Sequence, residues 1–221
     1  MGWLFKNRED AAAKLRELIP HNRMKQESWN IVSVSSGGLV VASHLRQRHE
    51  NSMDFLFSES IKAPNNKDCD IARVSEFEEL VIDTSLVDSF GIKYDYIYGE
   101  ARRRHEEKIL SYIYKYRKGR PFKDMSKQIV LIVDEGSETG MKMLCAVKTI
   151  LGMNPKAVYI ATPIIPTEVV EVLSPLVDDI FFVSEIKDYK QTSCYYKVLD
   201  KVLDKEIISI LGEKNEIRCS Y

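Results

Sequence analysis

Short apolar runs alternate with amphipathic stretches along most of the chain. The apolar runs cover residues 31–34, 53–57, 129–133, 157–162 and 179–183. The amphipathic stretches, with apolar residues at helical spacing, cover residues 7–18, 39–48, 98–118, 141–151, 168–173 and 196–211. Short runs that are apolar throughout are typical of strands buried on both faces. The alternation predicts an α/β fold, with a mostly parallel, twisted sheet and helices on both faces.

Two segments interrupt this alternation. Residues 63–70, which contain Pro64-Asn65-Asn66, have the composition of a polar loop. Residues 74–82 alternate poorly and are compatible with either a strand or a hairpin.

The composition limits the number of domains and the kinds of partner. The 221 residues, 44% hydrophobic and 29% charged, predict one globular domain that spans residues 1–221. Thirty-two basic and 33 acidic residues nearly cancel, so the chain has no general bias toward nucleic acid or membranes. No apolar run approaches about 18 residues and the first residues lack a secretory signal, so we expect a cytoplasmic protein. The four cysteines lie far apart, which favours free thiols over a zinc site.

The most informative segment follows the apolar run at 129–133. Two acids, Asp134 and Glu135, come first, and the loop Gly136-Ser137-Glu138-Thr139-Gly140 then leads into an amphipathic helix. A loop between a strand end and a helix offers free backbone N–H groups and the positive end of a helix dipole, which together bind phosphate. Two carboxylates beside such a loop suit a ligand that is polyhydroxylated, cationic or metal-bound. The combination predicts a site for a sugar phosphate.

Other phosphate-binding loops do not fit this segment. No lysine follows the second glycine, so a Walker nucleotide loop is excluded, and the G-x-G-x-x-G dinucleotide fingerprint is absent. A strand-to-helix turn without any ligand would fit Asp-Glu-Gly alone. The complete order of strand, acids, small residues and helix favours a binding site.

A second junction of the same kind is Ser35-Ser36-Gly37-Gly38, between the runs at 31–34 and 39–48. Taken alone, it fits a tight turn without a ligand. Ligands of parallel sheets bind beyond the carboxyl ends of the strands, where both loops are expected. Two anion-binding loops fit one sugar that carries phosphate at one end and diphosphate at the other.

The acidic loop resembles the motif by which type I phosphoribosyltransferases bind 5-phosphoribosyl 1-diphosphate (PRPP). In that family an apolar strand ends in two acids, and a loop that closes with Thr-Gly opens a helix. The resemblance implies that Asp134 and Glu135 hold the ribose hydroxyls, residues 136–140 hold the 5′-phosphate, and residues 35–38 hold the diphosphate. It also implies transfer of phosphoribosyl to a nitrogenous base, release of pyrophosphate, and Mg²⁺ chelated by the substrate without a protein metal site.

The whole chain resembles a bacterial group usually described as predicted phosphoribosyltransferases. The matching positions are Phe5, Arg8, Ala11-Ala12, Ser35-Ser36-Gly37-Gly38, Ala63-Pro64-Asn65-Asn66, Ile71-Ala72, Pro163 and Tyr195-Tyr196. The resemblance implies a small hood that selects the base, built from the N-terminal segment, residues 77–98 and the C-terminal region. It also allows a homodimer.

Three positions depart from the group's pattern. Ser36 stands where the group has an arginine, and Glu59-Ser60 stands where an Arg-Lys pair is expected. These cations would neutralise diphosphate, and Lys62 or Lys67 would have to replace them. The departures leave a second reading open, a domain that senses PRPP or a nucleotide without turnover.

A third reading rests on residues 100–120. Eight basic and three acidic residues give this segment a local net charge of 8 − 3 = +5, and Tyr112, Tyr114 and Tyr116 lie between the charges. Such a segment fits a nucleic-acid-associated protein on the same fold, or a basic lip over an anionic substrate. A solvated helix face is the simpler interpretation, and the near-zero net charge of the chain argues against nucleic acid.

Overall fold

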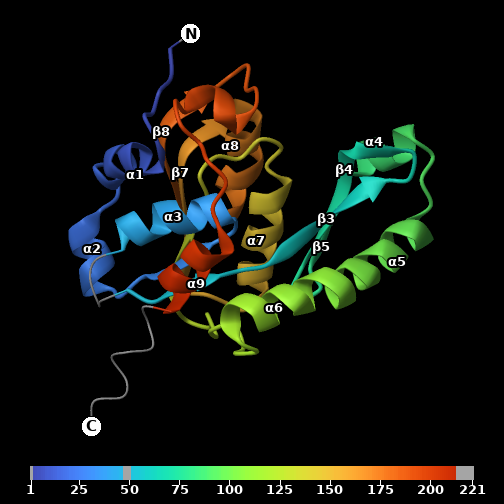
Figure 1. Ribbon diagram of the computed structural model, residues 1–221, viewed down its shortest axis with the longest axis horizontal. Helices are drawn as coiled ribbons and strands as arrows, with labels where there is room; N and C mark the ends of the chain where they lie inside the picture. The colour runs from blue at the N-terminus through green and yellow to red at the C-terminus, as the bar shows by residue number, and fades with distance from the viewer. Residues whose placement is uncertain (1, 47–50, 213–221) are drawn as a thin grey trace.

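A five-stranded parallel sheet forms the centre of the computed structural model, which describes residues 2–46 and 51–212 (Figure 1). The strands are β1 (Asn30–Ser33), β2 (Met53–Phe55), β6 (Ile129–Val133), β7 (Ala157–Pro166) and β8 (Asp179–Ile186), in the order β2-β1-β6-β7-β8. All four strand pairs are parallel. The predicted fold class is therefore confirmed.

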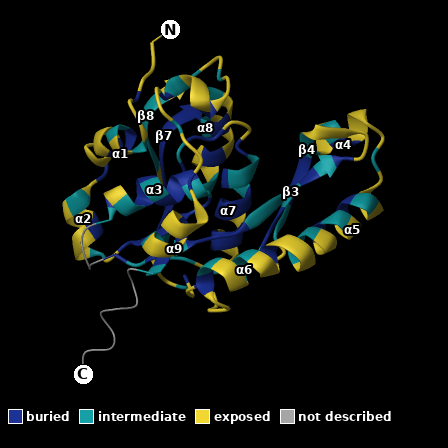
Figure 2. Ribbon diagram, viewed as in Figure 1, coloured by how far each residue is buried: buried dark blue, intermediate teal, exposed yellow. Residues whose placement is uncertain are grey.

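Alternate residues of the strands bury the two faces of this sheet under different helices. Leu131 and Val133 of β6 pack in one core cluster with residues of α1 (Arg8–Arg16), α3 (Ser36–Leu45) and α9 (Asp204–Gly212). Val130 and Ile132 pack in the other with residues of α7 (Met141–Gly152) and α8 (Thr167–Leu173). Figure 2 shows the buried residues concentrated in the central strands and α7. Burial on both faces explains why these strands are apolar throughout.

A second, antiparallel sheet projects from this body (Figure 1). It consists of β3 (Ser58–Ala63), β4 (Asn66–Ser75) and β5 (Leu80–Ile82), and α4 (Thr84–Ser89) and α5 (Tyr94–Arg104) follow it. The chain returns through the π-helical turn η1 (His105–Ile109) and α6 (Leu110–Arg117). The shorter helices are α2 (His21–Gln26), η2 (Ser174–Leu176) and η3 (Thr192–Tyr195).

Three predicted elements differ from the structure. Residues 63–70, expected as a polar loop, form a tight hairpin in which Ala63 pairs with Asn66, because the strands on either side pair with each other. The helix expected from residue 39 begins at Ser36, since the Ser35 hydroxyl accepts a hydrogen bond from the Gly38 N–H and caps it. The helix expected over 196–211 begins only at Asp204. The preceding residues are held in extended contacts with the N-terminal segment, where Tyr196 forms a parallel bridge with Phe5.

Candidate functional site

The two glycine-containing loops lie side by side at one edge of the sheet. Strands β1 and β6 are neighbours, with Ser33 opposite Val133, so the segments that follow them emerge together. A Cβ atom on Gly38 would lie 2.8 Å from the Asp134 Cα, and one on Gly37 would meet the Glu135 carboxylate. Glycine at these two positions therefore lets the start of α3 pack directly against the acidic loop.

The loop after the two acids leaves its backbone donors free. Within the described part of the chain, the N–H groups of residues 136–140 have no hydrogen-bond acceptor. The N-cap of α7 is Gly140, whose φ of 70° is left-handed and which provides no side-chain cap. Free N–H groups at an uncapped helix start are what an anion needs for binding.

Asp134 is a buried member of the site. Its Oδ1 accepts hydrogen bonds from the Ser35 hydroxyl at 2.5 Å and from the Glu135 N–H at 2.8 Å. Its Oδ2 lies 3.4 Å from the Lys142 Nζ, on the second residue of α7. Asp134 is fully buried by surface area, yet it lines the first of two hollows that lie beside the loops and are described below. Asp134 thus links the two loops and fixes their relative position.

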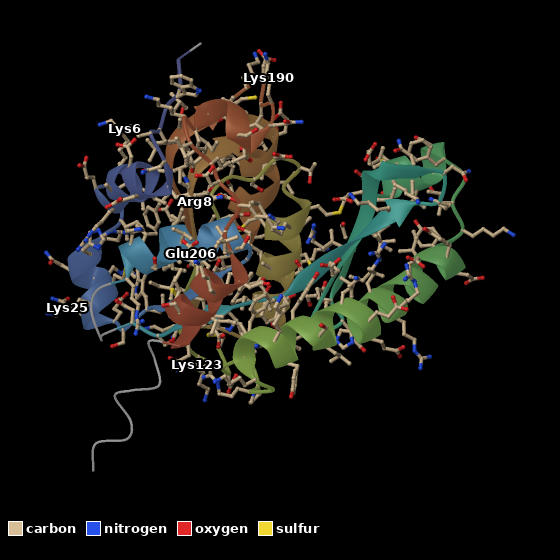
Figure 3. The ribbon with its side chains drawn as sticks, viewed as in Figure 1. Lys6, Arg8, Lys25, Lys123, Lys190 and Glu206 are labelled. Carbon is tan, nitrogen blue, oxygen red and sulfur yellow. The ribbon has the colours of Figure 1, made fainter. Side chains whose placement is uncertain are left out.

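Glu135 is held by residues from both ends of the chain. The Arg8 Nε donates to its Oε2 at 2.5 Å, and Arg8 also donates to the backbone oxygen of Asp200 at 2.7 Å. The Tyr196 hydroxyl donates to the backbone oxygen of Glu135 at 2.7 Å. Arg8 is labelled in Figure 3 on the side of α1 that faces the sheet. Burial, and then the neighbouring Asp134, raise the pKa of the Glu135 carboxyl, while Arg8 opposes this increase.

Residues 192–207, which we call the C-terminal strap, cross the site. At one end, the Thr192 N–H donates to Glu138 Oε1 at 2.9 Å, so the carboxylate that the loop carries is engaged by protein. A Cβ atom on Gly136 would lie 2.7 Å from the Thr192 Cγ2, so this glycine is needed for contact with the strap. At the other end, Asp204 bonds with Lys115 and with the Tyr116 hydroxyl, each at 2.6 Å.

Two adjacent hollows lie beside the two loops. The first hollow, about 430 Å³, is lined by Asp70, Arg73, Asp134, Glu135, Gly136, Ser137, Glu138, Thr139, Gly140, Lys142, Gln191, Thr192, Ser193 and Leu199. The second hollow, about 360 Å³, is lined by Val34, Ser35, Ser36, Phe55, Phe57, Ser58, Glu59, Arg73, Tyr112, Tyr116, Lys142, Lys201, Val202, Asp204 and Ile207. Arg73 and Lys142 line both. The strap contributes to both as well.

The structure brings the candidate residues of the sequence together in different ways. The whole acidic loop, from Asp134 to Gly140, lines the first hollow, although Ser137 is nearly buried. Ser35 and Ser36 line the second hollow. Gly37 and Gly38 line neither and serve the packing of α3.

The sequence analysis did not identify the cationic side chains that line the two hollows. Lys62 is paired with Asp70, and neither Lys62 nor Lys67 lines a hollow. Arg73 and Lys142 line both hollows instead. Only Lys142 carried a sequence signal, since it comes two residues after the Thr-Gly that closes the loop.

The basic segment at 100–120 is largely neutralised by its own neighbours. Arg102, Arg103 and Arg104 form ion pairs with glutamates one helical turn away. Arg117 is buried against Glu76. Tyr112 and Tyr116 pack on the Phe57 ring, with centroids 6.0 and 5.9 Å away. These contacts fit the solvated helix face better than a nucleic-acid surface.

The described residues contain no cluster of three or more potential metal ligands among His, Cys, Asp and Glu. None of their helices is long and apolar enough to cross a membrane. Cys69, Cys145 and Cys194 are free thiols, and Cys219 lies outside the described residues.

Known proteins resemble the chain in fold. No family model matches it. The structure of TT1426 from Thermus thermophilus matches with a TM-score of 0.75 and 26% identity, over 95% of this chain and 98% of that one. This match shows that the two proteins share a fold over nearly their whole length.

More distant structures also match. One is a hypothetical protein from Neisseria gonorrhoeae with bound ppGpp, at a TM-score of 0.48 and 12% identity, over 97% of this chain and 99% of that one. Another is a hypoxanthine-guanine phosphoribosyltransferase from Bacillus anthracis, at a TM-score of 0.48 and 14% identity, over 86% of each chain. The solved structures that match this chain thus include phosphoribosyltransferases.

Proposed function

We propose that this protein binds PRPP and transfers its phosphoribosyl group to a nitrogenous base, with release of pyrophosphate. One observation carries the proposal. The five consecutive residues 136–140 line a hollow at an uncapped helix start, and their backbone N–H groups lack acceptors within the described chain. This arrangement supports binding of a phosphate monoester.

Asp134 and Glu135, beside the loop, are suited to the ribose of PRPP. Arg8 uses Oε2 of Glu135, and Oε1 has no hydrogen-bond partner among the described residues, so one carboxylate oxygen remains for a hydroxyl group. Asp134 is held in place by Ser35 and presents Oδ2 toward Lys142. In this proposal Glu135 holds the ribose diol directly, and Asp134 fixes the geometry of both loops.

The second hollow would hold the other end of PRPP. It begins at Ser35 and Ser36, directly beside the acidic loop. Mg²⁺ suits this substrate, because it prefers phosphate oxygens and water to a full set of protein ligands.

The chemical step needs little from the protein beyond placement. The bond from the ribose C1 to the diphosphate oxygen breaks, and its electron pair leaves with the diphosphate. A ring nitrogen of the base forms the new bond to C1, and a proton on that nitrogen is lost to solvent. Holding both ends of PRPP beside the base supplies the entropic part of the acceleration.

The hood that would select the acceptor base belongs to the same proposal. The projecting sheet and α4–α5 contain residues 77–98, and the strap lies across the hollows, so we assign the hood to these segments. Soluble substrates of this kind fit the cytoplasmic location expected from the sequence.

A second function is favoured by one observation. Glu59 lines the second hollow at a place where a cation is expected, and it adds negative charge beside the diphosphate. A domain that binds PRPP or a nucleotide without turnover would tolerate this charge better than an enzyme would. The two functions share the same site and differ only in pyrophosphate release.

Binding of ribose 5-phosphate and of PRPP with Mg²⁺, measured by calorimetry and thermal shift, tests the proposal. Thr139 is exposed on the loop. Thr139→Glu adds a carboxylate to the phosphate site and should weaken both ligands about tenfold or more, whereas Thr139→Gln, of the same size, should change them little. Absence of binding at millimolar ligand, or equal affinities for the two variants, would overturn the proposal.

Turnover decides between the two functions. The protein is incubated with PRPP, Mg²⁺ and a panel of purine, pyrimidine and pyridine bases, and pyrophosphate is measured. Release with one base establishes the transferase. Tight binding of PRPP without release across the panel establishes the sensing domain.

A further inference from the structure

Arg73 and Lys142 lie at the boundary between the two hollows. They are the two cationic residues, among those described, that line both. Arg73 belongs to β4 in the projecting sheet, and Lys142 to the first turn of α7 in the main body. Two positive charges from separate elements thus lie at the boundary that a substrate occupying both hollows would span.

Both cations have hydrogen-bonding capacity left. Arg73 uses Nη1 for contacts with Ser58, 3.3 Å to its backbone oxygen and 3.0 Å to its hydroxyl. Its Nε and Nη2 form no hydrogen bond or ion pair with the described residues. Among the described residues Lys142 has one polar partner, the Asp134 Oδ2 at 3.4 Å, and its side chain is 34% exposed. An ammonium group has three N–H donors, and this long ion pair uses at most one of them, so the others can bind a ligand.

Besides Arg73 and Lys142, the described lining of the second hollow contains one cation, Lys201 of the strap. The loop of this hollow offers Ser35 and Ser36 with no cation between them, and Glu59 adds a negative charge. Asp204, also in its wall, is already paired with Lys115 at 2.6 Å. A diphosphate beside Ser35 and Ser36 would therefore lack compensation from its own loop.

We propose that Arg73 and Lys142 together bind the diphosphate of the substrate and stabilise it as it leaves. This inference rests on the proposed function and assigns to β4 and α7 the charge that the loop at 35–38 lacks. Negative charge grows on the diphosphate oxygen as its bond to C1 breaks, and fixed cations next to it lower the barrier. Both residues would touch the substrate and so would be catalytic residues.

The two ends of the substrate can be tested separately. Inorganic pyrophosphate and ribose 5-phosphate are titrated, each with Mg²⁺, into the full chain and into Arg73→Gln and Lys142→Gln. We expect pyrophosphate to bind about tenfold more weakly or worse in each variant, because charge-assisted hydrogen bonds are lost. Ribose 5-phosphate should lose at least threefold less affinity than pyrophosphate in the same variant.

Matched controls exclude general effects of charge and folding. Lys148→Gln removes an exposed lysine from the same helix, away from both hollows, and should leave both affinities unchanged. Arg73→Lys keeps the charge and should restore most of the pyrophosphate affinity. Melting temperatures of all variants identify any loss due to unfolding.

The outcomes separate the two proposals. If the unaltered chain binds neither ligand, the proposed function itself fails. If it binds both ligands, and Arg73→Gln and Lys142→Gln weaken neither or weaken both equally, the function stands and the assignment of these two cations is wrong.

Discussion

The Arg8 Nε lies 2.5 Å from the Glu135 Oε2, so the first helix of the chain is tied to the acid that follows the central strand of the main sheet. Both side chains are mostly buried, with 15% and 20% of their surfaces exposed. Arg8 also reaches the backbone of Asp200 in the strap. The contact therefore joins three segments that are far apart in sequence.

Breaking this pair should destabilise the fold. Arg8→Gln leaves the Glu135 carboxylate partly buried beside Asp134 without its cation, and we expect a loss of about 2 kcal/mol in the free energy of unfolding. Urea unfolding of Arg8→Gln, Glu135→Gln and the double variant forms a double-mutant cycle. A coupling energy near zero would contradict the assigned contact.

Glu135 should also make stability depend on pH. Its pKa is raised above the ordinary 4.5, first by burial and then by Asp134. The folded state therefore holds this proton to higher pH than the unfolded chain does. The resulting stabilisation is complete below pH 4.5 and is lost as the pH rises through the folded-state pKa.

Urea unfolding between about pH 4 and pH 8 measures this effect. The stability of the unaltered protein relative to Glu135→Gln should fall as the pH rises. Asp10→Asn is the control of opposite sign, because a hydrogen bond from the Lys6 N–H and the Lys14 side chain lower the pKa of Asp10. If the stability of the unaltered protein relative to Glu135→Gln rose with pH, the raised pKa of Glu135 would be refuted.

Gly140 should be intolerant of a side chain. Its φ is 70°, and a Cβ atom would lie 2.8 Å from the Val169 side chain. Gly140→Ala should cost about 1–3 kcal/mol in the free energy of unfolding, as measured by urea denaturation. Gly99 lies within α5 with open space around it, so Gly99→Ala should stabilise the protein by about 0.5–1 kcal/mol. Equal changes in the free energy of unfolding for Gly140→Ala and Gly99→Ala would contradict the left-handed conformation of Gly140.

Gly37 and Gly38 should differ although they are neighbours in α3. A Cβ on Gly38 meets backbone atoms of Val133 and Asp134 at 2.8 Å, which cannot move easily. The three atoms nearest to a Cβ on Gly37 all belong to the Glu135 carboxyl group, at the far end of a flexible side chain. Gly38→Ala should therefore cost about 1–3 kcal/mol, and Gly37→Ala clearly less, in urea unfolding.

Local patterns predicted the main sheet well. The strand Ile129–Val133 has the predicted bounds, because an apolar run buried on both faces has few alternatives. The prediction of a polar loop at residues 63–70 was wrong. These residues have polar side chains, and their strand structure depends on backbone pairing with a partner strand, which composition does not show. The last helix was predicted too early for a similar reason. Tyr196 fits a helix locally, yet its ring packs on Phe5 and its hydroxyl binds the Glu135 backbone.

The site was predicted in part. The acidic loop and the serine-glycine loop could be found because each is a continuous stretch with its own composition. The roles of Arg8, Arg73 and Thr192 could not, because each reaches the loop from a distant element and depends on how the elements pack. Whether the acids hold ribose, as the family resemblance implies, stays a prediction.

The convergence of α1 and the strap on Glu135 bears on the order in which the site forms during folding. Arg8 lies 127 residues from Glu135 in the sequence, and Tyr196 lies 61 residues from it. Contacts between residues so far apart carry a large loop-closure entropy, which earlier contacts must first reduce. The contacts that hold Glu135 should therefore form only after the main sheet has brought these segments together.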